Sequence, residues 1–303
     1  MRKLKKKLIE LVTHDGSFHT DDIFACATLS ILLENKKEKF KIIRTRNQKI
    51  IDSGDYVFDV GVIYNEKLNK FDHHQIGGAG KREGKEAIEY SSFGLVWKKF
   101  GPKICENKKV ADRVDKKLVS PIDAWDNGFD LAVNKYDVSP YFIQHIFFSM
   151  EPTWRENSDI DKIFLKCVEM AKIILGREII QAQDDILAEK SVIDIYQKTP
   201  DKRIIILDKE YPVQRTLHNF PEPLFVIYPR KTRNYWGVKA VKKDPKTFIN
   251  RKNFPASWMG LRDEELQKIT RVADSVFCHR RLFLAVAKSK EGAIKLAELA
   301  LIG

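Results

Sequence analysis

The first half of the chain alternates between two patterns of apolar residues. Short runs rich in β-branched or aromatic side chains are typical of strands, whereas the longer apolar stretch at about 21–33 favours a helix. The strand-like runs are Leu8–Thr13, Lys41–Thr45 and Tyr56–Val60. Strands that alternate with helices form parallel sheets, and such sheets bind ligands at the carboxyl ends of their strands. His14 and Asp59 therefore lie where a site is expected.

Glycine and proline divide the pattern further along. The glycine-rich segment Ile76–Gly84 predicts a loop beside the site. Helices are expected at Ser91–Phe100, ended by Gly101, and at Lys108–Leu118, after which Pro121 predicts a turn. The first half is therefore expected to form an α/β domain.

The second half has a different pattern. Apolar residues recur with a helical period from residue 158 to about 195, which predicts a connecting helix or helix pair. Strand-like runs then return at 203–207, 224–228, 236–241 and 276–286, and a final helix is expected near 290–301. We expect an α/β parallel-sheet domain over residues 1–155, a helical connector over 156–199 and a smaller α+β domain over 200–303.

Positive charge gathers in the last third of the chain. Residues 200–303 hold 21 Lys and Arg against 11 Asp and Glu, and so carry +10 of the total charge of +12. This asymmetry favours a polyanionic partner such as single-stranded nucleic acid, although lysines scattered over a solvated surface would give the same count.

Several features predict a cytoplasmic protein. No stretch approaches the roughly 18 uninterrupted apolar residues of a membrane span, so no membrane partner is expected. The basic start, from Arg2 to Lys7, runs directly into the first strand and leaves no room for a removable signal sequence. The four cysteines lie far apart without a Cys-x-x-Cys pair, which fits a reducing compartment.

Possible metal ligands gather in four separate segments. The turn Thr13–Asp22 holds two histidines and three aspartates between a predicted strand and a predicted helix. Each segment also has a plainer interpretation, since Asp21 could cap a helix and Asp126-Asn127-Gly128 could form an ordinary turn. The candidates are His14, His19 and Asp21 in the first segment, then Asp59, then Asp72-His73-His74, and finally Asp123 with Asp126.

The residue types in these segments indicate one kind of site. Imidazoles mixed with carboxylates suit manganese, zinc or magnesium and differ from the thiolate sites of structural zinc. Two such ions about 3.5–4 Å apart share a carboxylate, activate a water and stabilise the entering and leaving oxygens at phosphorus. We therefore expect two divalent ions, with manganese preferred over magnesium or zinc, and a phosphodiester hydrolase.

The motifs resemble a known family. The turn His14–Asp22 (HDGSFHTDD) and the run Phe71–Gln75 (FDHHQ) resemble the melanocyte-proliferating-gene (Myg) exonuclease family, a branch of the DHH phosphoesterase superfamily. Ala256–Arg262 and Phe277–His279 resemble its later signatures, so the resemblance covers nearly the whole chain. It implies a DHH-type metal domain, a nucleic-acid-binding domain, and a metal-dependent 3′-to-5′ exonuclease acting on single-stranded RNA or short oligonucleotides.

The resemblance also implies roles for individual residues. One ion would be held by His14, His19 and Asp59, and the other by Asp21, Asp59, His73 and Asp123, with Asp59 as the bridge. His74 would contact the scissile phosphate. In the basic last third, we expect His279, Arg280 and Arg281 to bind substrate. The roles of Asp22, Asp72 and Asp126 stay open, as does the oligomeric state.

The chain departs from the related sequences at four places. The wider superfamily has an aspartate where His19 stands, and the family usually has Asn and Glu where Asp15 and Asp22 stand. After His279 the family tends towards a glycine-rich turn, whereas this chain continues with Arg280-Arg281-Leu282.

Three alternatives remain at this point. The same metal ligands could serve a phosphohydrolase of small substrates such as pyrophosphate or cyclic and short oligonucleotides. The chain could also be a non-catalytic RNA-binding protein that retains the metal site, or a metal amidohydrolase.

Overall fold

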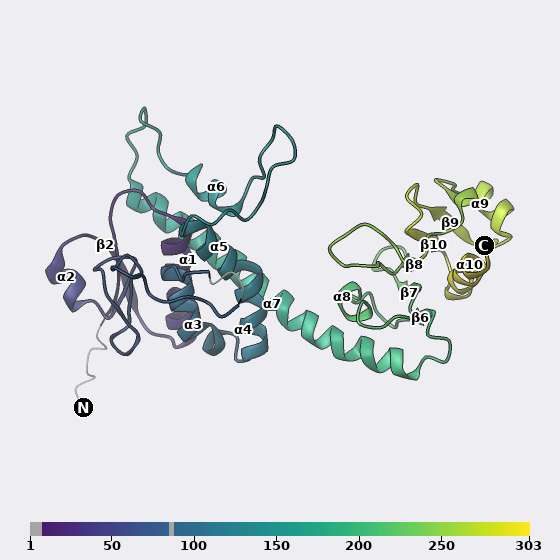
Figure 1. Cartoon of the computed structure of the whole chain (residues 1–303), viewed down its shortest axis with the longest axis horizontal. Helices are drawn as coiled ribbons and strands as arrows, with labels where there is room; N and C mark the ends of the chain where they lie inside the picture. The colour runs from purple at the N-terminus through teal and green to yellow at the C-terminus, as the bar shows by residue number, and fades with distance from the viewer. Residues whose placement is uncertain (1–7, 85–87) are drawn as a thin grey trace. The chain divides into compact units, whose positions relative to one another are not determined.

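The structure is a computed structural model that describes residues 8–84 and 88–303 (Figure 1). The basic start of the chain, on which the predicted compartment partly depends, lies outside the described residues. The chain divides into two compact units, Met1–Gln183 and Asp184–Gly303, and the division falls within the long helix α7 (Ile160–Lys198). The three domain ranges expected from the sequence stay a prediction.

In the described part of the first unit, five strands form a sheet in the order β2-β1-β3-β5-β4. β1 runs parallel to β2 and β3, and β3 runs parallel to β5, while the edge strand β4 is antiparallel to β5. The predicted parallel sheet is thus confirmed, and the carboxyl ends of β1, β3 and β5 meet at one edge. The strands are β1 (Ile9–Thr13), β2 (Phe40–Arg44), β3 (Tyr56–Phe58), β4 (Tyr64–Asn65) and β5 (Lys70–Phe71).

Helix α1 (Thr20–Asn35) follows β1 and is buried on nearly every side. Apolar residues all round a helix are typical of a position inside a core. α1 packs along α3 (Ser92–Ile104), and the rings of Phe24 and Phe93 stack with centroids 5.2 Å apart. This packing holds the start of α1 beside the end of β1. The remaining helices are α2 (Gln48–Ser53), η1 (Glu66–Leu68), α4 (Lys108–Val114), the π-helical η2 (Asp115–Val119), α5 (Ser120–Asp126) and α6 (Ile143–Phe148).

Two predicted breaks are wrong. Gly101 does not end α3, which continues to Ile104. A Cβ at Gly101 would lie 2.6 Å from the indole of Trp97, so the glycine serves close packing within the helix. Pro121 makes no turn either. It lies in the first turn of α5, and the backbone is helical without a break from η2 through Pro121.

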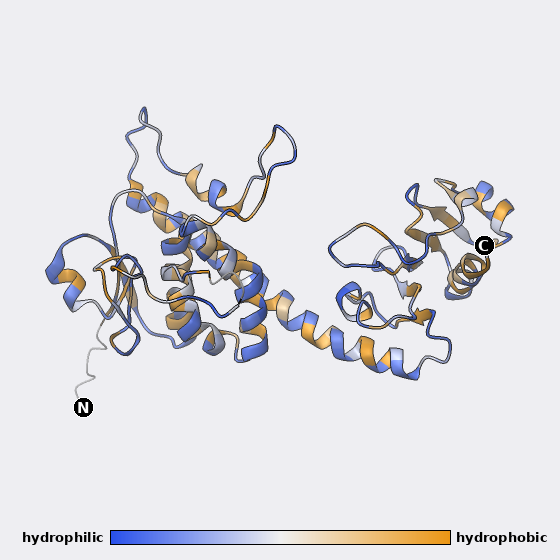
Figure 2. Ribbon diagram, in the orientation of Figure 1, coloured by the Kyte–Doolittle hydropathy of each residue, from blue (hydrophilic) through white to orange (hydrophobic). Residues whose placement is uncertain are grey.

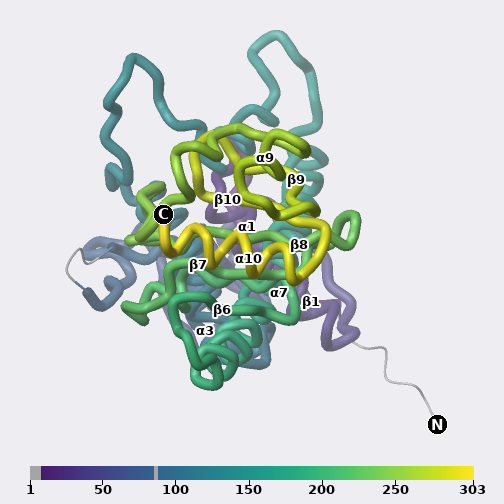
Figure 3. Tube along the Cα trace, turned by 90° about the vertical axis from the view of Figure 1, so that its right-hand side faces the viewer, coloured from purple at the N-terminus to yellow at the C-terminus, as the bar shows by residue number. Residues whose placement is uncertain are grey.

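Residues 184–303, all of which are described, form a second sheet in the order β6-β7-β8-β10-β9. β6 is parallel to β7, and the other neighbours are antiparallel. Helix α10 (Lys290–Ile302) packs across β7, β8 and β10 (Figure 3). The expected α+β architecture is therefore confirmed. The elements are β6 (Ile204–Ile206), α8 (Gln214–Leu217), β7 (Phe225–Pro229), β8 (Trp236–Ala240), η3 (Ala256–Trp258), α9 (Asp263–Thr270), β9 (Ser275–Cys278) and β10 (Leu284–Ala287).

The run 276–286, predicted as one strand, is a hairpin. The N–H of Leu282 donates to the carbonyl of His279 at 2.7 Å and closes the turn between β9 and β10. Leu282 has a φ of 56°, in the left-handed region that glycine adopts most readily. The chain thus makes the turn without glycine, and Arg280 and Arg281 lie at its tip.

Apolar and polar residues alternate along α7 (Figure 2). Phe164, Cys167, Ala171 and Leu175 recur at helical spacing and are buried. The predicted helix over 158–195 is confirmed as one continuous helix. Among the residues that the structure describes, no helix combines the length and the apolar character needed to cross a bilayer.

Candidate metal centre

Three strands of the first sheet end in candidate ligands. His14 directly follows β1, Asp59 directly follows β3 and Asp72 directly follows β5. Because these strands are parallel neighbours, the three residues share one edge of the sheet. Asp59 has a φ of 54°, which aspartate tolerates better than most residues, and the backbone bends there. The strand-end positions predicted for His14 and Asp59 are confirmed.

A first group joins His14, Asp22 and Asp59. Nε2 of His14 lies 3.2 Å from Oδ2 of Asp22 and 3.2 Å from Oδ2 of Asp59. Its other ring nitrogen, Nδ1, lies 3.0 Å from the backbone oxygen of Asp15. A hydrogen bond there would fix the ring and leave Nε2 for a metal, as is common in metal sites. His19, at the N-cap of α1, joins Asp21 and Asp59 in an overlapping group.

The two carboxylate oxygens of Asp22 have different partners. Its Oδ1 accepts the backbone N–H of His19 at 3.0 Å, which caps the start of α1, while its Oδ2 faces His14. Capping thus orients the carboxylate towards the centre. The sequence showed Asp22 only as one more acid in the turn, because a cap and a ligand have the same local pattern.

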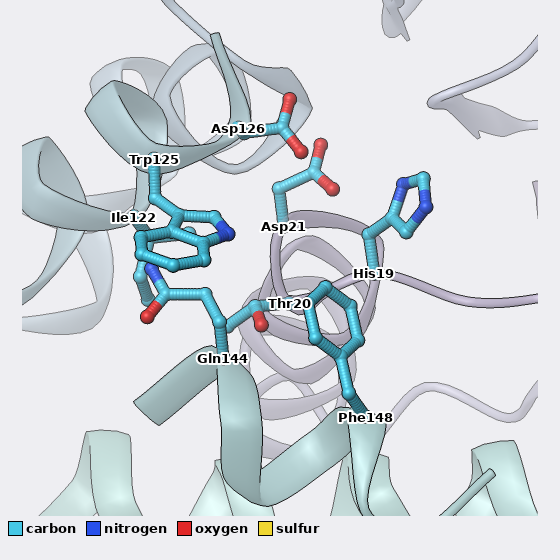
Figure 4. A pocket seen from close by; sticks show the side chains of 8 residues that line it. All are labelled: His19, Thr20, Asp21, Ile122, Trp125, Asp126, Gln144 and Phe148. Carbon is cyan, nitrogen blue, oxygen red and sulfur yellow. The ribbon is translucent and has the colours of Figure 1, made fainter. Parts of the chain in front are cut away.

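A second group joins Asp21, His73 and Asp126. Nε2 of His73 lies 3.2 Å from Oδ2 of Asp126, 3.4 Å from Oδ1 of Asp59 and 3.9 Å from Oδ2 of Asp21. Asp21 comes from the first turn of α1 and Asp126 from the end of α5, and their carboxylates face one another in Figure 4. Side chains from distant parts of the chain therefore meet at one point.

The carboxylate of Asp21 stands out among the candidate ligands. Asp21 is fully buried, and within the described chain neither of its carboxylate oxygens has a hydrogen-bond partner. Burial, together with the charges of Asp126, Asp59 and Asp22, raises the pKa of Asp21 well above its usual range. A buried carboxylate needs a partner charge, and a divalent cation would provide it. The residues therefore fit divalent ions.

The imidazoles respond to the same negative charge. Burial alone would lower the pKa of His14, but Asp22 and Asp59 outweigh it and raise the pKa to about 10. For Asp59 the two effects have opposite signs. Burial would raise the pKa of this carboxyl group, but the side chains of His14 and His73 outweigh burial and lower it. Without a cation, protons on the imidazoles thus balance part of the charge.

His74 lies at the open side of the centre. Its side chain is 55% exposed, and its Nδ1 lies 2.7 Å from Oδ1 of Asp72. Asp72 also accepts the N–H of Val62 at 2.6 Å and the N–H of His73 at 2.7 Å. Asp72 therefore orients the histidine pair, and it belongs to none of the ligand groups in the described chain.

Asp123 was expected to hold the second ion, but its carboxylate faces other partners. One of its oxygens accepts hydrogen bonds from the Ser91 hydroxyl at 2.6 Å and the Gly94 N–H at 3.0 Å, and the other pairs with Arg82. These partners hold both oxygens, and Asp123 belongs to none of the possible ligand groups in the described chain. Asp126, one helical turn later, lies beside His73 in its place.

The substrate-binding residues expected in the last third lie around one cavity of the second unit. The cavity has a volume of about 450 Å³. His279 is partly buried, and its ring centroid lies 4.3 Å from that of Phe283, while Arg280 and Arg281 are exposed. The cavity thus combines cations with aromatic rings. The cavity is also lined by Lys239 and by three residues that the sequence did not single out, Lys242, Phe248 and Asn250.

Comparison with known proteins identifies the family. The model named MYG1_exonuc, described as an uncharacterised protein family (UPF0160), matches residues 10–301. A MYG1 protein of Dictyostelium discoideum is 29% identical over 316 residues, 95% of this chain and 95% of the relative. The MYG1 exonuclease of Homo sapiens is 28% identical over 326 residues, 95% of this chain and 85% of the relative.

A solved structure is also similar, but only weakly. RecJ of Thermus thermophilus in complex with Mn²⁺ aligns with 97% of this chain and 52% of its own length, at 11% identity. Its TM-score of 0.29 does not establish a common fold. The family match and the curated relatives, by contrast, extend over nearly the whole chain, as the motifs do. This chain belongs to the MYG1 exonuclease family.

Proposed function

We propose that this chain is a metal-dependent exonuclease that hydrolyses single-stranded RNA from its 3′ end. The observation that carries the proposal is the set of possible ligand groups around Asp59, which belongs to three of the four groups found among the described residues. Beside it, Asp21 keeps two buried oxygens without a hydrogen-bond partner in the described chain. Two divalent ions bound there would supply an activated water and would neutralise charge on the phosphate.

The geometry suggests how the ligands divide. Asp59 is the shared ligand, since its oxygens lie 3.2 Å from Nε2 of His14 and 3.4 Å from Nε2 of His73. Manganese suits this mixture of imidazole and carboxylate, with magnesium or zinc as alternatives. We assign His14, His19, Asp22 and Asp59 to one ion and Asp21, Asp59, His73 and Asp126 to the other.

His74 is proposed to contact the scissile phosphate. Because Asp72 holds Nδ1, the second ring nitrogen is left for a ligand at the exposed side. The hydrogen bond to Asp72 outweighs burial and raises the pKa of His74. The shift favours the imidazolium, which donates a charge-assisted hydrogen bond to a phosphate oxygen.

Two observations support a nucleic-acid substrate over pyrophosphate. The human relative is named an exonuclease. In addition, the cavity of the second unit joins four cationic side chains to two phenylalanine rings, a combination that proteins use to bind single strands. The RNA preference, the 3′-to-5′ direction and action in the cytoplasm are parts of this proposal.

The test is hydrolysis of 5′-end-labelled single-stranded RNA with manganese, beside the matched DNA and pyrophosphate. The wild type is expected to shorten the RNA stepwise from its 3′ end. Asp59→Ala is expected to abolish turnover, because it removes the shared ligand, and Asp59→Asn provides a second variant with less change in shape. Asp112→Ala, at an exposed aspartate of α4, is the matched control and should retain activity.

Each outcome decides between the candidates. Manganese-dependent activity that survives both Asp59 substitutions would overturn the two-ion centre. Phosphate release from pyrophosphate alone would indicate a small-substrate phosphohydrolase. RNA binding without hydrolysis by any divalent ion would indicate a binding protein.

A further inference from the structure

A second, small cavity lies beside the candidate metal centre (Figure 4). Its volume is about 160 Å³, and helices α1, α5 and α6 supply its walls. The residues that matter are Thr20, Asp21, Trp125, Asp126, Gln144 and Phe148. Since Asp21 and Asp126 are also candidate ligands, the cavity and the metal centre share a wall.

The walls differ in chemistry. The carboxylates of Asp21 and Asp126 lie on one side, and the rings of Trp125 and Phe148 lie with Thr20 and Gln144 around the rest (Figure 4). Aromatic faces combined with a few placed polar groups are typical of sites that bind a flat, polar ring.

The polar groups of the aromatic side are shielded from water. Thr20 and Gln144 are each only 3% exposed. The hydroxyl oxygen of Thr20 has no hydrogen-bond partner within the described chain. A buried hydroxyl without a partner is unfavourable, and a ligand atom could supply the missing bond. The amide of Gln144 offers both donors and an acceptor, which match the edge of a nucleobase.

The volume of the cavity limits how many nucleobases it can hold. A cavity needs about 10–15 Å³ to hold one water, so this one has room for a group of roughly ten heavy atoms. A group of this size corresponds to one nucleobase, so the cavity cannot hold a stack of several bases. A site that takes one base next to the metal centre suits the last nucleotide of a strand, because no further chain must be accommodated beyond it.

We infer that this cavity binds the base of the terminal nucleotide, with its phosphate directed towards the ion that Asp21 and Asp126 would hold. Trp125 and Phe148 contact the faces of the ring, and Thr20 and Gln144 contact its edge. The inference deepens the proposed exonuclease function and rests on it for the position of the phosphate.

Binding of products tests the cavity without turnover. Isothermal titration with manganese compares adenosine 5′-monophosphate with ribose 5-phosphate, which has the same phosphate but no base. In the wild type the base is expected to tighten binding at least about fivefold, the lower end of base stacking on aromatic rings. Gln144→Leu and Phe148→Ala are expected to bring this ratio close to one.

Matched controls separate the cavity from general effects. Gln197→Leu replaces an exposed glutamine of α7, and Phe129→Ala replaces a phenylalanine that is 37% exposed, close to the 39% of Phe148. Both controls should keep the wild-type ratio. Equal binding of the two phosphates to the wild type, or an unchanged ratio in both cavity variants, would overturn the inference.

Kinetics gives a second measurement. RNA that ends in an abasic nucleotide should have a higher KM than RNA with an intact end, with kcat little changed. The two cavity variants should lose this preference, so that their KM values for the two ends become similar. If no RNA is hydrolysed, the proposed function fails, and the binding ratio alone decides the cavity. If RNA is hydrolysed with equal preference for both ends, only the cavity inference fails.

Discussion

Arg82 and Asp123 form a buried ion pair that joins the glycine-rich loop to helix α5. Arg82 also pairs with Asp115 of the π-helical turn, at 2.9 Å. The network thus joins the glycine-rich loop to η2 and α5. Asp123 faces Arg82, and it belongs to none of the possible ligand groups in the described chain.

Loss of the Arg82 guanidinium should destabilise the first unit strongly. Arg82→Ala is expected to lower the free energy of unfolding by about 3–5 kcal/mol, because it leaves the buried charge of Asp123 unpaired. Urea unfolding in the presence of a chelator, followed by circular dichroism, measures the loss. The neighbouring Lys81→Ala removes an exposed ion pair with Glu89 and should lower it by less than about 1 kcal/mol. Similar losses in the two variants would contradict a buried network.

Substitutions of Asp123 and Asp126, the two aspartates of α5, should have different effects on the affinity for manganese. Asp126→Ala is expected to weaken manganese binding by at least about tenfold, since it removes a side chain that faces His73. Asp123→Asn keeps the shape of the side chain and should retain the affinity while the protein becomes less stable. Calorimetric titration with manganese, combined with thermal unfolding, makes the comparison. Weaker manganese binding by Asp123→Asn alone would return Asp123 to the ligand set.

Metal binding should release protons and strengthen with pH. His14 has a pKa of about 10 without a cation and must lose its proton to bind a metal through Nε2. Below that pKa, each increase of one pH unit should tighten manganese binding by about tenfold for this one proton. Titrations between pH 6.5 and 8 in buffers of different ionisation enthalpy count the protons released. His14→Gln is expected to flatten this dependence, and an unchanged slope would rule out His14 as the source.

RNA binding should depend on salt through the second unit. Arg280→Ala and Arg281→Ala are each expected to lower the slope of log K against log salt by about 0.7, the value for one contact with a single-stranded phosphate. Lys295→Ala, at an exposed position of α10, serves as the control and should leave the slope unchanged. Fluorescence anisotropy of a labelled RNA, with calcium in place of manganese, measures the slopes. Unchanged slopes in both arginine variants would place the RNA elsewhere.

The sequence by itself determined much of the secondary structure and the chemistry of the candidate site. Strand and helix periods are local, so β1, β3, α1 and α7 could be read from neighbouring residues. Residue type alone decides which ions suit imidazole and carboxylate groups. The strand-end positions of His14 and Asp59 followed from the parallel order of the elements, which the alternating pattern already contained.

Only the tertiary structure decided which acid of α5 faces the centre. Asp123 and Asp126 lie three residues apart, close to the same face of a helix, so no local signal separates them. Arg82, 41 residues before Asp123, pairs with it, whereas Asp126 lies beside His73 in a possible ligand group. Packing also overrode the local break signals of Gly101 and Pro121. Contacts between residues distant in the chain carry these decisions, and the local pattern contains no information about them.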